Sequence, residues 1–172
     1  MVSETVSKGK GVEFFSAKNL DAASQTATSL KTERLEIGFK EGVDEQLFME
    51  GSVSFAKHIK NVAFSFPDSG LHIGILELEP NLPSPLHSHS DDCAYYVEKG
   101  SLIMGNREIG AGEGFLTRKD QPYGFVVGPN GARIIEFTTH PRATLMVHDR
   151  RIAAWRERLD RAVERLDHPL SA

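Results

Sequence analysis

The chain has 172 residues, of which 40% are apolar, and a net charge of −4 at pH 7. This length and apolar content suit one domain with one core. A slightly acidic chain has no general attraction to phosphate backbones, so we expect no nucleic-acid partner. No apolar run approaches the roughly 20 residues of a membrane span, and the first residues lack a secretory pattern, so we expect a cytoplasmic protein without a membrane partner. The single cysteine, Cys93, excludes an intrachain disulfide.

The N-terminal third has a mixed pattern. Residues 1–11 are polar and rich in Gly, Lys and Ser, which is typical of a flexible arm. Between residues 12 and 50 only short edge strands are expected, at 12–15 and 35–39, with an Ala/Ser/Thr-rich stretch between them.

A regular pattern of short strands begins at residue 53 and continues to residue 147. Alternating apolar runs are separated by Gly- and Pro-containing turn signals, for example at 105–106 and 128–131. The strands expected are 62–66, 71–78, 93–97, 101–104, 114–117, 123–127, 132–138 and 143–147. Short strands spaced about 8–12 residues apart indicate a sandwich or a barrel. We therefore assign residues 12–148 to one β-barrel with N-terminal edge strands.

The end of the chain has the period of a helix. Apolar residues at steps of three and four predict an amphipathic helix over 149–168, with Asp149 as its N-cap. The apolar stripe consists of Ile152, Trp155, Leu159, Ala162 and Leu166. Such a stripe either covers one end of the barrel or pairs with a second copy. Together with the edge strands that an open barrel must cover, it predicts a homodimer.

Two histidines give the first chemical signal. His87 and His89 are two residues apart, so in an extended strand both imidazoles lie on one face. Two imidazoles that converge inside a barrel form the core of a metal site, whereas the same spacing also occurs on ordinary solvated strands. Pro83 and Pro85 stiffen the chain that leads to them.

Residues 71–137 resemble the cupin family in both of its signature motifs. In the first motif His87, His89 and Gly100 stand where the family has two histidines and a glycine, but Cys93 holds the position of the family's glutamate. In the second motif Gly112 stands at the start, and Tyr123 holds the position of the histidine. The resemblance implies an all-β fold, a double-stranded β-helix of the cupin or jelly-roll type, here followed by the C-terminal amphipathic helix. It also implies a divalent metal ion, Fe, Zn, Mn or Ni, inside the barrel.

The two substituted positions leave the ligand set open. Cys93 either completes the metal set of His87 and His89 as a thiolate or packs as a small hydrophobic residue. Tyr123 is the candidate catalytic residue, as a proton donor, and an alternative fourth ligand. Tyr95 lies two residues after Cys93 and is expected to line the substrate pocket. His72 is a further pocket candidate, and Asp91, Asp92 and His72 are alternative candidates for the missing ligand.

Two functions follow from these residues. The first is a metal-dependent enzyme of the cupin type that acts on a small molecule; isomerase, lyase and oxygenase chemistry all remain open. The alternative is a metal-free module or sensor, in which the histidines and Tyr123 hydrogen-bond a small ligand without chemistry.

Overall fold

The computed structural model describes residues 7–9, 12–17, 36–66, 69–139 and 144–168. Its strands are β1 (Ser7–Gly9), β2 (Val12–Phe14), β3 (Glu36–Phe39), β4 (Ile59–Phe66), β5 (Leu71–Leu78), β6 (His87–His89), β7 (Cys93–Met104), β8 (Arg107–Gly110), β9 (Gly114–Thr117), β10 (Val126–Thr138) and β11 (Thr144–Val147). Its helices are α2 (Glu45–Ala56) and α3 (Ile152–Asp167).

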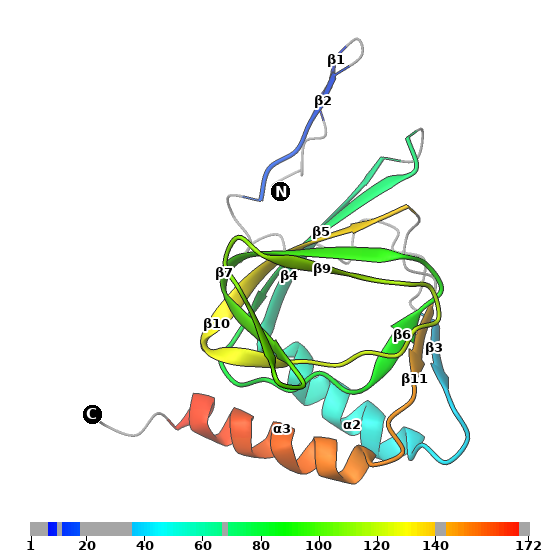
Figure 1. Ribbon diagram of the computed structural model, residues 1–172, viewed down its shortest axis with the longest axis vertical. Coiled ribbons are helices and arrows are strands. Elements are labelled where there is room, and N and C mark those ends of the chain that lie inside the picture. The colour runs from blue at the N-terminus through cyan, green and yellow to red at the C-terminus, as the bar shows by residue number, and fades with distance from the viewer. Residues whose placement is uncertain (1–6, 10–11, 18–35, 67–68, 140–143, 169–172) are drawn as a thin grey trace.

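Two sheets enclose the interior of the molecule. The larger sheet has the order β4-β5-β10-β7-β8, with β9 also paired to β7, and the smaller has the order β3-β11-β6. The strands surround a common interior, and both helices lie together on one side of it (Figure 1). This arrangement confirms the expected β-barrel with a C-terminal helix. Neither described helix is long and apolar enough to cross a membrane.

Two expected turns are irregularities inside long strands. We expected one pair of separate strands on either side of Gly100 and another on either side of residues 128–131. Instead β7 continues through Gly100 and β10 continues through 128–131, and the pairing of β7 with β10 has register shifts near these points. Gly100 has a φ of +69°, and a Cβ atom there would lie 1.9 Å from the Gly131 carbonyl oxygen. Only glycine fits this close approach. Such local irregularities bend the paired strands, which helps a sheet close into a barrel.

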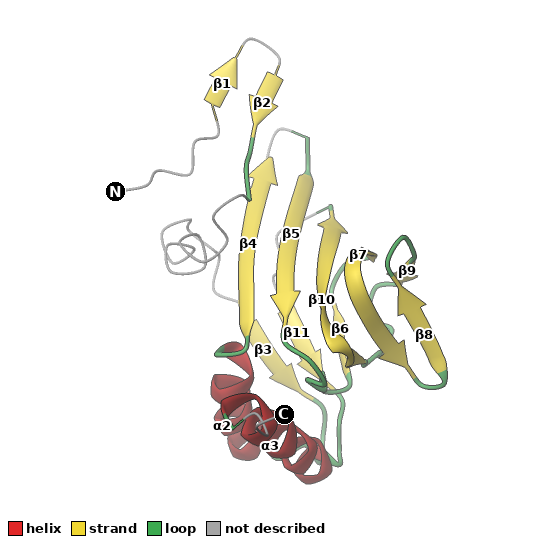
Figure 2. Cartoon of the chain, turned by 90° about the vertical axis from the view of Figure 1, so that its left-hand side faces the viewer, coloured by secondary structure: helices red, strands yellow, loops and turns green. Residues whose placement is uncertain are grey.

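The N-terminal third differs from the expectation in two places. Part of the supposed arm is ordered, because Ser7–Gly9 pairs with Val12–Phe14 in a two-stranded ribbon that projects from the barrel (Figures 1 and 2); residues 1–6 and 10–11 lie outside the described residues. The second difference is α2, where we expected only edge strands and, from residue 53, barrel. Asp44 caps α2, since its carboxylate accepts the Leu47 N–H at 3.0 Å.

Helix α3 begins slightly later than expected. Its N-cap is Arg151, and Asp149 instead accepts the Arg151 N–H at 3.0 Å in the preceding turn. The helix ends at Asp167, with His168 as the C-cap, close to the expected end.

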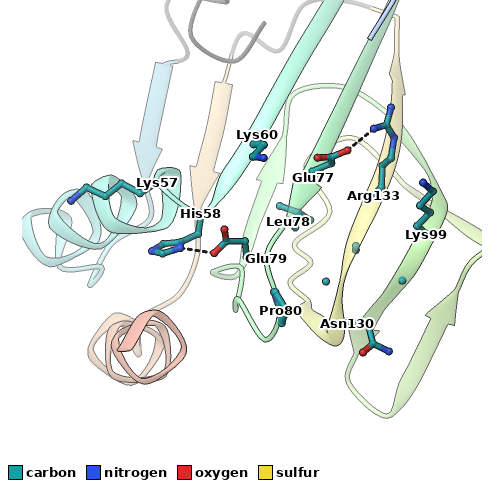
Figure 3. Close-up of a pocket in the computed structure, with 13 residues that line it drawn as sticks. Lys57, His58, Lys60, Glu77, Leu78, Glu79, Pro80, Lys99, Asn130 and Arg133 are labelled. Carbon is teal, nitrogen blue, oxygen red and sulfur yellow. Dashed lines mark hydrogen bonds and ion pairs between the residues drawn. The ribbon is translucent and has the colours of Figure 1, made fainter. Parts of the chain in front are cut away.

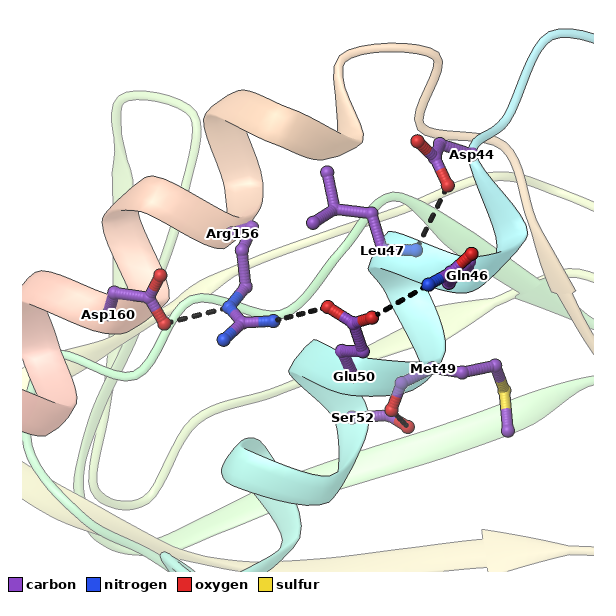
Figure 4. A network of polar contacts seen from close by, with 8 residues as sticks. All are labelled: Asp44, Gln46, Leu47, Met49, Glu50, Ser52, Arg156 and Asp160. Carbon is purple, nitrogen blue, oxygen red and sulfur yellow. Dashed lines mark hydrogen bonds and ion pairs between the residues drawn. The ribbon is translucent and has the colours of Figure 1, made fainter.

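The two helices pack on each other and on the barrel. Trp155 of α3 stacks on Phe48 of α2, with ring centroids 5.6 Å apart, and lies against Gly51, where a Cβ atom would come within 2.5 Å of the indole. On their solvent side Arg156 reaches Glu50 of α2 and Asp160 of its own helix (Figure 4). The apolar stripe of α3 is buried within its own chain, because the exposed fraction is at most 2% for Ile152, Trp155 and Leu159.

Candidate functional site

Alternate residues of β7 and β10 point into the barrel. Cys93 and Tyr95 of β7 are buried, whereas the next residue, Tyr96, is 43% exposed. Glu136 of β10 pairs with Tyr95 in register and is also buried. This agrees with the prediction that Tyr95 and Cys93 share a face, because residues two apart in a strand point to the same side.

The two histidines of β6 lie close together in the interior. His87 and His89 are 7% and 4% exposed, and their ring centroids are 5.0 Å apart. The segment that carries Tyr123 lies beside them, since His87 and Tyr123 exchange both of their backbone hydrogen bonds at 2.9 Å. His87, His89 and Tyr123 therefore lie together in the interior.

The side chains form a chain of hydrogen bonds. The Tyr123 hydroxyl lies 3.1 Å from His89 Nε2 and 2.6 Å from the Tyr95 hydroxyl. His87 Nδ1 lies 2.8 Å from the Pro85 carbonyl, which can only accept. His87 Nδ1 therefore carries a proton, and in the neutral ring the lone pair is on Nε2.

Cys93 is paired with a residue that sequence reasoning missed. Its thiol is fully buried and donates to the Glu136 carboxylate at 2.7 Å. Cys93 is therefore not surrounded by apolar groups alone, as its packing interpretation assumed. The only sequence signal for Glu136 is a carboxylate at an inward position of the 132–138 strand, two residues from the buried Ile134.

The thiol donor makes a specific stability prediction. Cys93→Ser keeps an O–H that can donate to Glu136, whereas Cys93→Val removes the donor from a buried carboxylate. Because leaving a buried polar group unsatisfied costs about 1–3 kcal/mol, we expect the valine variant to be less stable than the serine variant by an amount in this range. Urea unfolding of the two variants measures the difference. A valine variant as stable as the serine variant would show that Glu136 does not depend on Cys93.

The described residues do not fit the expected metal set. Among residues 7–9, 12–17, 36–66, 69–139 and 144–168, no three or more His, Cys, Asp or Glu side chains are grouped so as to hold an ion. The Cys93 thiol is directed to Glu136, so His87, His89 and Cys93 are not assembled as a ligand set.

Among the described residues, none of the other candidate ligands, His72, Asp91 and Asp92, is grouped with two further such side chains so as to hold an ion. His72 of β5 is half-buried and pairs in register with Thr138. Asp92 is directed outward: the Lys119 backbone N–H and then the Arg118 guanidinium hold the pKa of its carboxyl below the ordinary value.

A cavity of about 240 Å³ opens next to the tyrosines and His87. Its polar side chains are few, and three of them are His87, Tyr95 and Tyr123. Most of the wall is apolar and comes from the barrel and from both helices, including Phe48 and Trp155. His72, His89 and Cys93 do not line this cavity. The interior site therefore has an apolar body and one polar side.

A third histidine, His148, contacts β6 through Ser88, the residue between His87 and His89. The Ser88 hydroxyl lies 2.9 Å from His148 Nε2. Burial, followed by the nearby positive charge of Lys40, lowers the pKa of His148, so the neutral ring is favoured. This contact fixes the strand that carries His87 and His89.

A second hollow of about 330 Å³ lies on the outside of the larger sheet (Figure 3). Its charged side chains are largely paired with one another: Arg133 contacts Glu77, and His58 contacts Glu79 at 2.7 Å. None of the site residues predicted from the sequence lines it.

No family model and no curated protein matches this sequence. Several solved structures are similar to it. The polyketide cyclase RemF from Streptomyces resistomycificus is 25% identical over 53% of this chain and 71% of its own, with a TM-score of 0.45. An RmlC-like cupin from Shewanella frigidimarina is 19% identical over 47% and 75%, with a TM-score of 0.42. KdgF from a Halomonas species is 20% identical over 50% and 81%, with a TM-score of 0.42.

Proposed function

We propose that this chain, which has the cupin fold, binds a small and mainly apolar molecule inside its barrel and holds an oxygen atom of that molecule at Tyr123 and His87. The observation that carries the proposal is the cavity of about 240 Å³, in which the hydrogen-bonding side chains of His87, Tyr95 and Tyr123 lie among apolar walls. Pockets of this composition are typical ligand sites, because apolar walls supply affinity and a few polar groups fix orientation.

The size and chemistry of the cavity limit the ligand. Pockets for drug-sized ligands have volumes of roughly 300–1,000 Å³, so this cavity of about 240 Å³ suits a smaller molecule. A phenol hydroxyl donates and accepts, and His87 with its proton on Nδ1 accepts at Nε2. A hydroxyl group on an aromatic or alicyclic body complements both side chains, whereas a carbonyl oxygen complements the Tyr123 donor. A strongly polar metabolite is disfavoured, because such a ligand would lose its hydration against the aromatic wall of Phe48 and Trp155.

Acetophenone is a suitable probe, since it has an aromatic body and one carbonyl oxygen. We expect it to bind in an NMR titration, and we expect Tyr123→Phe to weaken its affinity by about 2–10-fold, the effect of one net hydrogen bond. Toluene, which has no oxygen, should bind the parent and the variant equally. Tyr96→Phe is the matched control, because Tyr96 is 43% exposed on the other face of β7.

Two results would count against the proposal. Absence of binding by both probes would contradict an apolar ligand site. A loss of acetophenone binding after dialysis against a chelator would instead favour a metal ion at His87 and His89. The proposal expects the affinity to be unchanged by that dialysis, because the side chains named above hold the ligand directly.

A second candidate function is catalysis of proton transfer on such a ligand. It is favoured by the hydrogen-bonded chain from His89 through Tyr123 to Tyr95, and by the His87 ring beside Tyr123, with centroids 4.4 Å apart. A phenol donor and an imidazole acceptor on one side of an apolar cavity are the parts of a general acid and a general base.

A further inference from the structure

We propose that His89 is a positioning residue that determines which kind of oxygen atom the interior site binds. In this proposal, which rests on the proposed function, the Nε2–H of His89 donates to the Tyr123 oxygen. Tyr123 can then donate its own proton to an acceptor oxygen of the ligand. The direction of this one hydrogen bond decides whether the site selects a ligand that accepts at Tyr123 or one that donates there.

The two hydrogen-bond contacts of the Tyr123 hydroxyl differ in length. The Tyr123 oxygen lies 3.1 Å from His89 Nε2 and 2.6 Å from the Tyr95 oxygen. A hydrogen bond that a hydroxyl donates to an oxygen measures roughly 2.5–3.0 Å between heavy atoms, and one that an N–H donates to an oxygen measures roughly 2.7–3.2 Å. The shorter contact therefore fits a hydroxyl donor, and the longer contact fits the N–H of His89 as the donor.

The direction of the His89 hydrogen bond matters because a phenol hydroxyl has only one proton, with two lone pairs. If Tyr123 donated to His89, its proton would be used there, and its oxygen could only accept from a ligand. If His89 donates to Tyr123, the Tyr123 proton is directed to Tyr95 or to the ligand. Either tyrosine hydroxyl can be the donor in their contact, so Tyr95 can donate to Tyr123 once the ligand is bound. Two donors on one oxygen polarise its O–H and strengthen the hydrogen bond to the ligand.

His89 acts on the ligand only through Tyr123. Its side chain is 4% exposed and does not line the cavity, whereas His87, Tyr95 and Tyr123 do. His87 has the opposite proton position, because its Nδ1–H donates to the Pro85 carbonyl and its Nε2 accepts. The cavity therefore presents a donor at Tyr123 beside an acceptor at His87. An alcohol or a phenol matches both side chains, and a ketone matches Tyr123 alone.

Proton–nitrogen correlation NMR of the isotopically labelled full chain shows which ring nitrogen of each histidine carries a proton. We expect a proton on Nε2 of His89 and on Nδ1 of His87. The spectra of His89→Gln and His87→Gln assign the signals, because one ring is missing from each variant. A His89 ring with its proton on Nδ1 alone would overturn the proposal, whatever the protein binds.

Acetophenone titrations of two variants test the same direction independently. A glutamine side chain can donate from its amide, so His89→Gln should keep the acetophenone affinity within about twofold of the parent. His89→Leu removes the donor and should lower the affinity by about 2–10-fold, the range of one net hydrogen bond. If Tyr123 donated to His89 in the parent, the leucine variant would release the Tyr123 proton and raise the affinity. A raised or unchanged affinity would therefore overturn the proposal.

Toluene separates the role of His89 in hydrogen bonding from a role in packing. Toluene has no oxygen, so it should bind the parent, His89→Gln and His89→Leu equally. A lower toluene affinity in the leucine variant would assign the effect of that variant to packing, and the proton position of His89 in the parent then decides the proposal. If the parent binds neither probe, the proposed function fails, while the NMR spectrum still reports the His89 proton, so the two failures are distinguishable.

Discussion

Replacing Trp155 with alanine is expected to lower the free energy of unfolding by about 3–5 kcal/mol. The indole is 1% exposed and fills the space between α2, α3 and the barrel, stacked on Phe48 and in contact with Gly51. Its Nε1–H also donates to the Pro83 carbonyl at 2.9 Å. The variant therefore loses a large buried apolar group, leaves a cavity and removes the donor from a buried carbonyl.

Urea unfolding followed by far-ultraviolet circular dichroism measures this loss, since Trp155 is the only tryptophan and its fluorescence disappears with it. Arg158→Ala is the control on the same helix. Arg158 is exposed, and alanine is a good helix former, so its unfolding free energy should stay within about 0.5 kcal/mol of the parent. A loss below roughly 1 kcal/mol for Trp155→Ala would contradict the packing of α3 on the barrel.

Helix α2, which carries Phe48, was the main feature that could not be predicted. Phe48 and Gly51 pack inward, but α2 also has exposed apolar residues, Met49 and Val53. The hydrophobic pattern is therefore not one-sided, and periodicity alone does not reveal the helix. In α3 the exposed face is strongly charged, so the same method located that helix well.

The strands were predictable where Gly or polar turn residues mark both of their ends. The bounds of β5 and β9 agree with the sequence prediction residue for residue, because their edges are marked by Gly and by polar turns. The long strands β7 and β10 were divided wrongly at Gly100 and at 128–131. A glycine signals a special backbone conformation, but a turn and a bulge use the same signal.

The site was predictable only to the extent that it depends on spacing within one strand. His87 and His89, or Cys93 and Tyr95, share a face because they are two residues apart. The partnership of Cys93 with Glu136 depends on how β10 pairs with β7, and register across 43 residues of chain is not readable from the pattern. A pocket beside Tyr95 was expected, but the part of its wall that comes from α2 was not, because α2 itself was not predicted.

The proton-transfer candidate predicts that the protein accelerates hydrogen–deuterium exchange at the methyl group of acetophenone in D₂O. In the proposed step the Tyr123 hydroxyl donates a hydrogen bond to the carbonyl oxygen, while His87 Nε2 removes one methyl proton and the electron pair of that C–H bond moves into the enolate. The imidazolium exchanges its proton with D₂O and returns a deuteron to the carbon. The carbonyl is regenerated, so the only net change is hydrogen replaced by deuterium.

Proton NMR of the methyl signal measures the rate, with imidazole at the same concentration as the reference. Tyr123→Phe and His87→Gln should each lower the rate by about 10²–10⁴-fold, the usual contribution of a positioned acid or base. Tyr96→Phe should leave it unchanged, because Tyr96 points away from the cavity. Acetophenone binding is measured on every variant, so a loss of rate beyond the loss of affinity belongs to the chemical step. Exchange no faster than with free imidazole, in a protein that binds acetophenone, would reject catalysis of this step and leave the ligand-binding proposal standing.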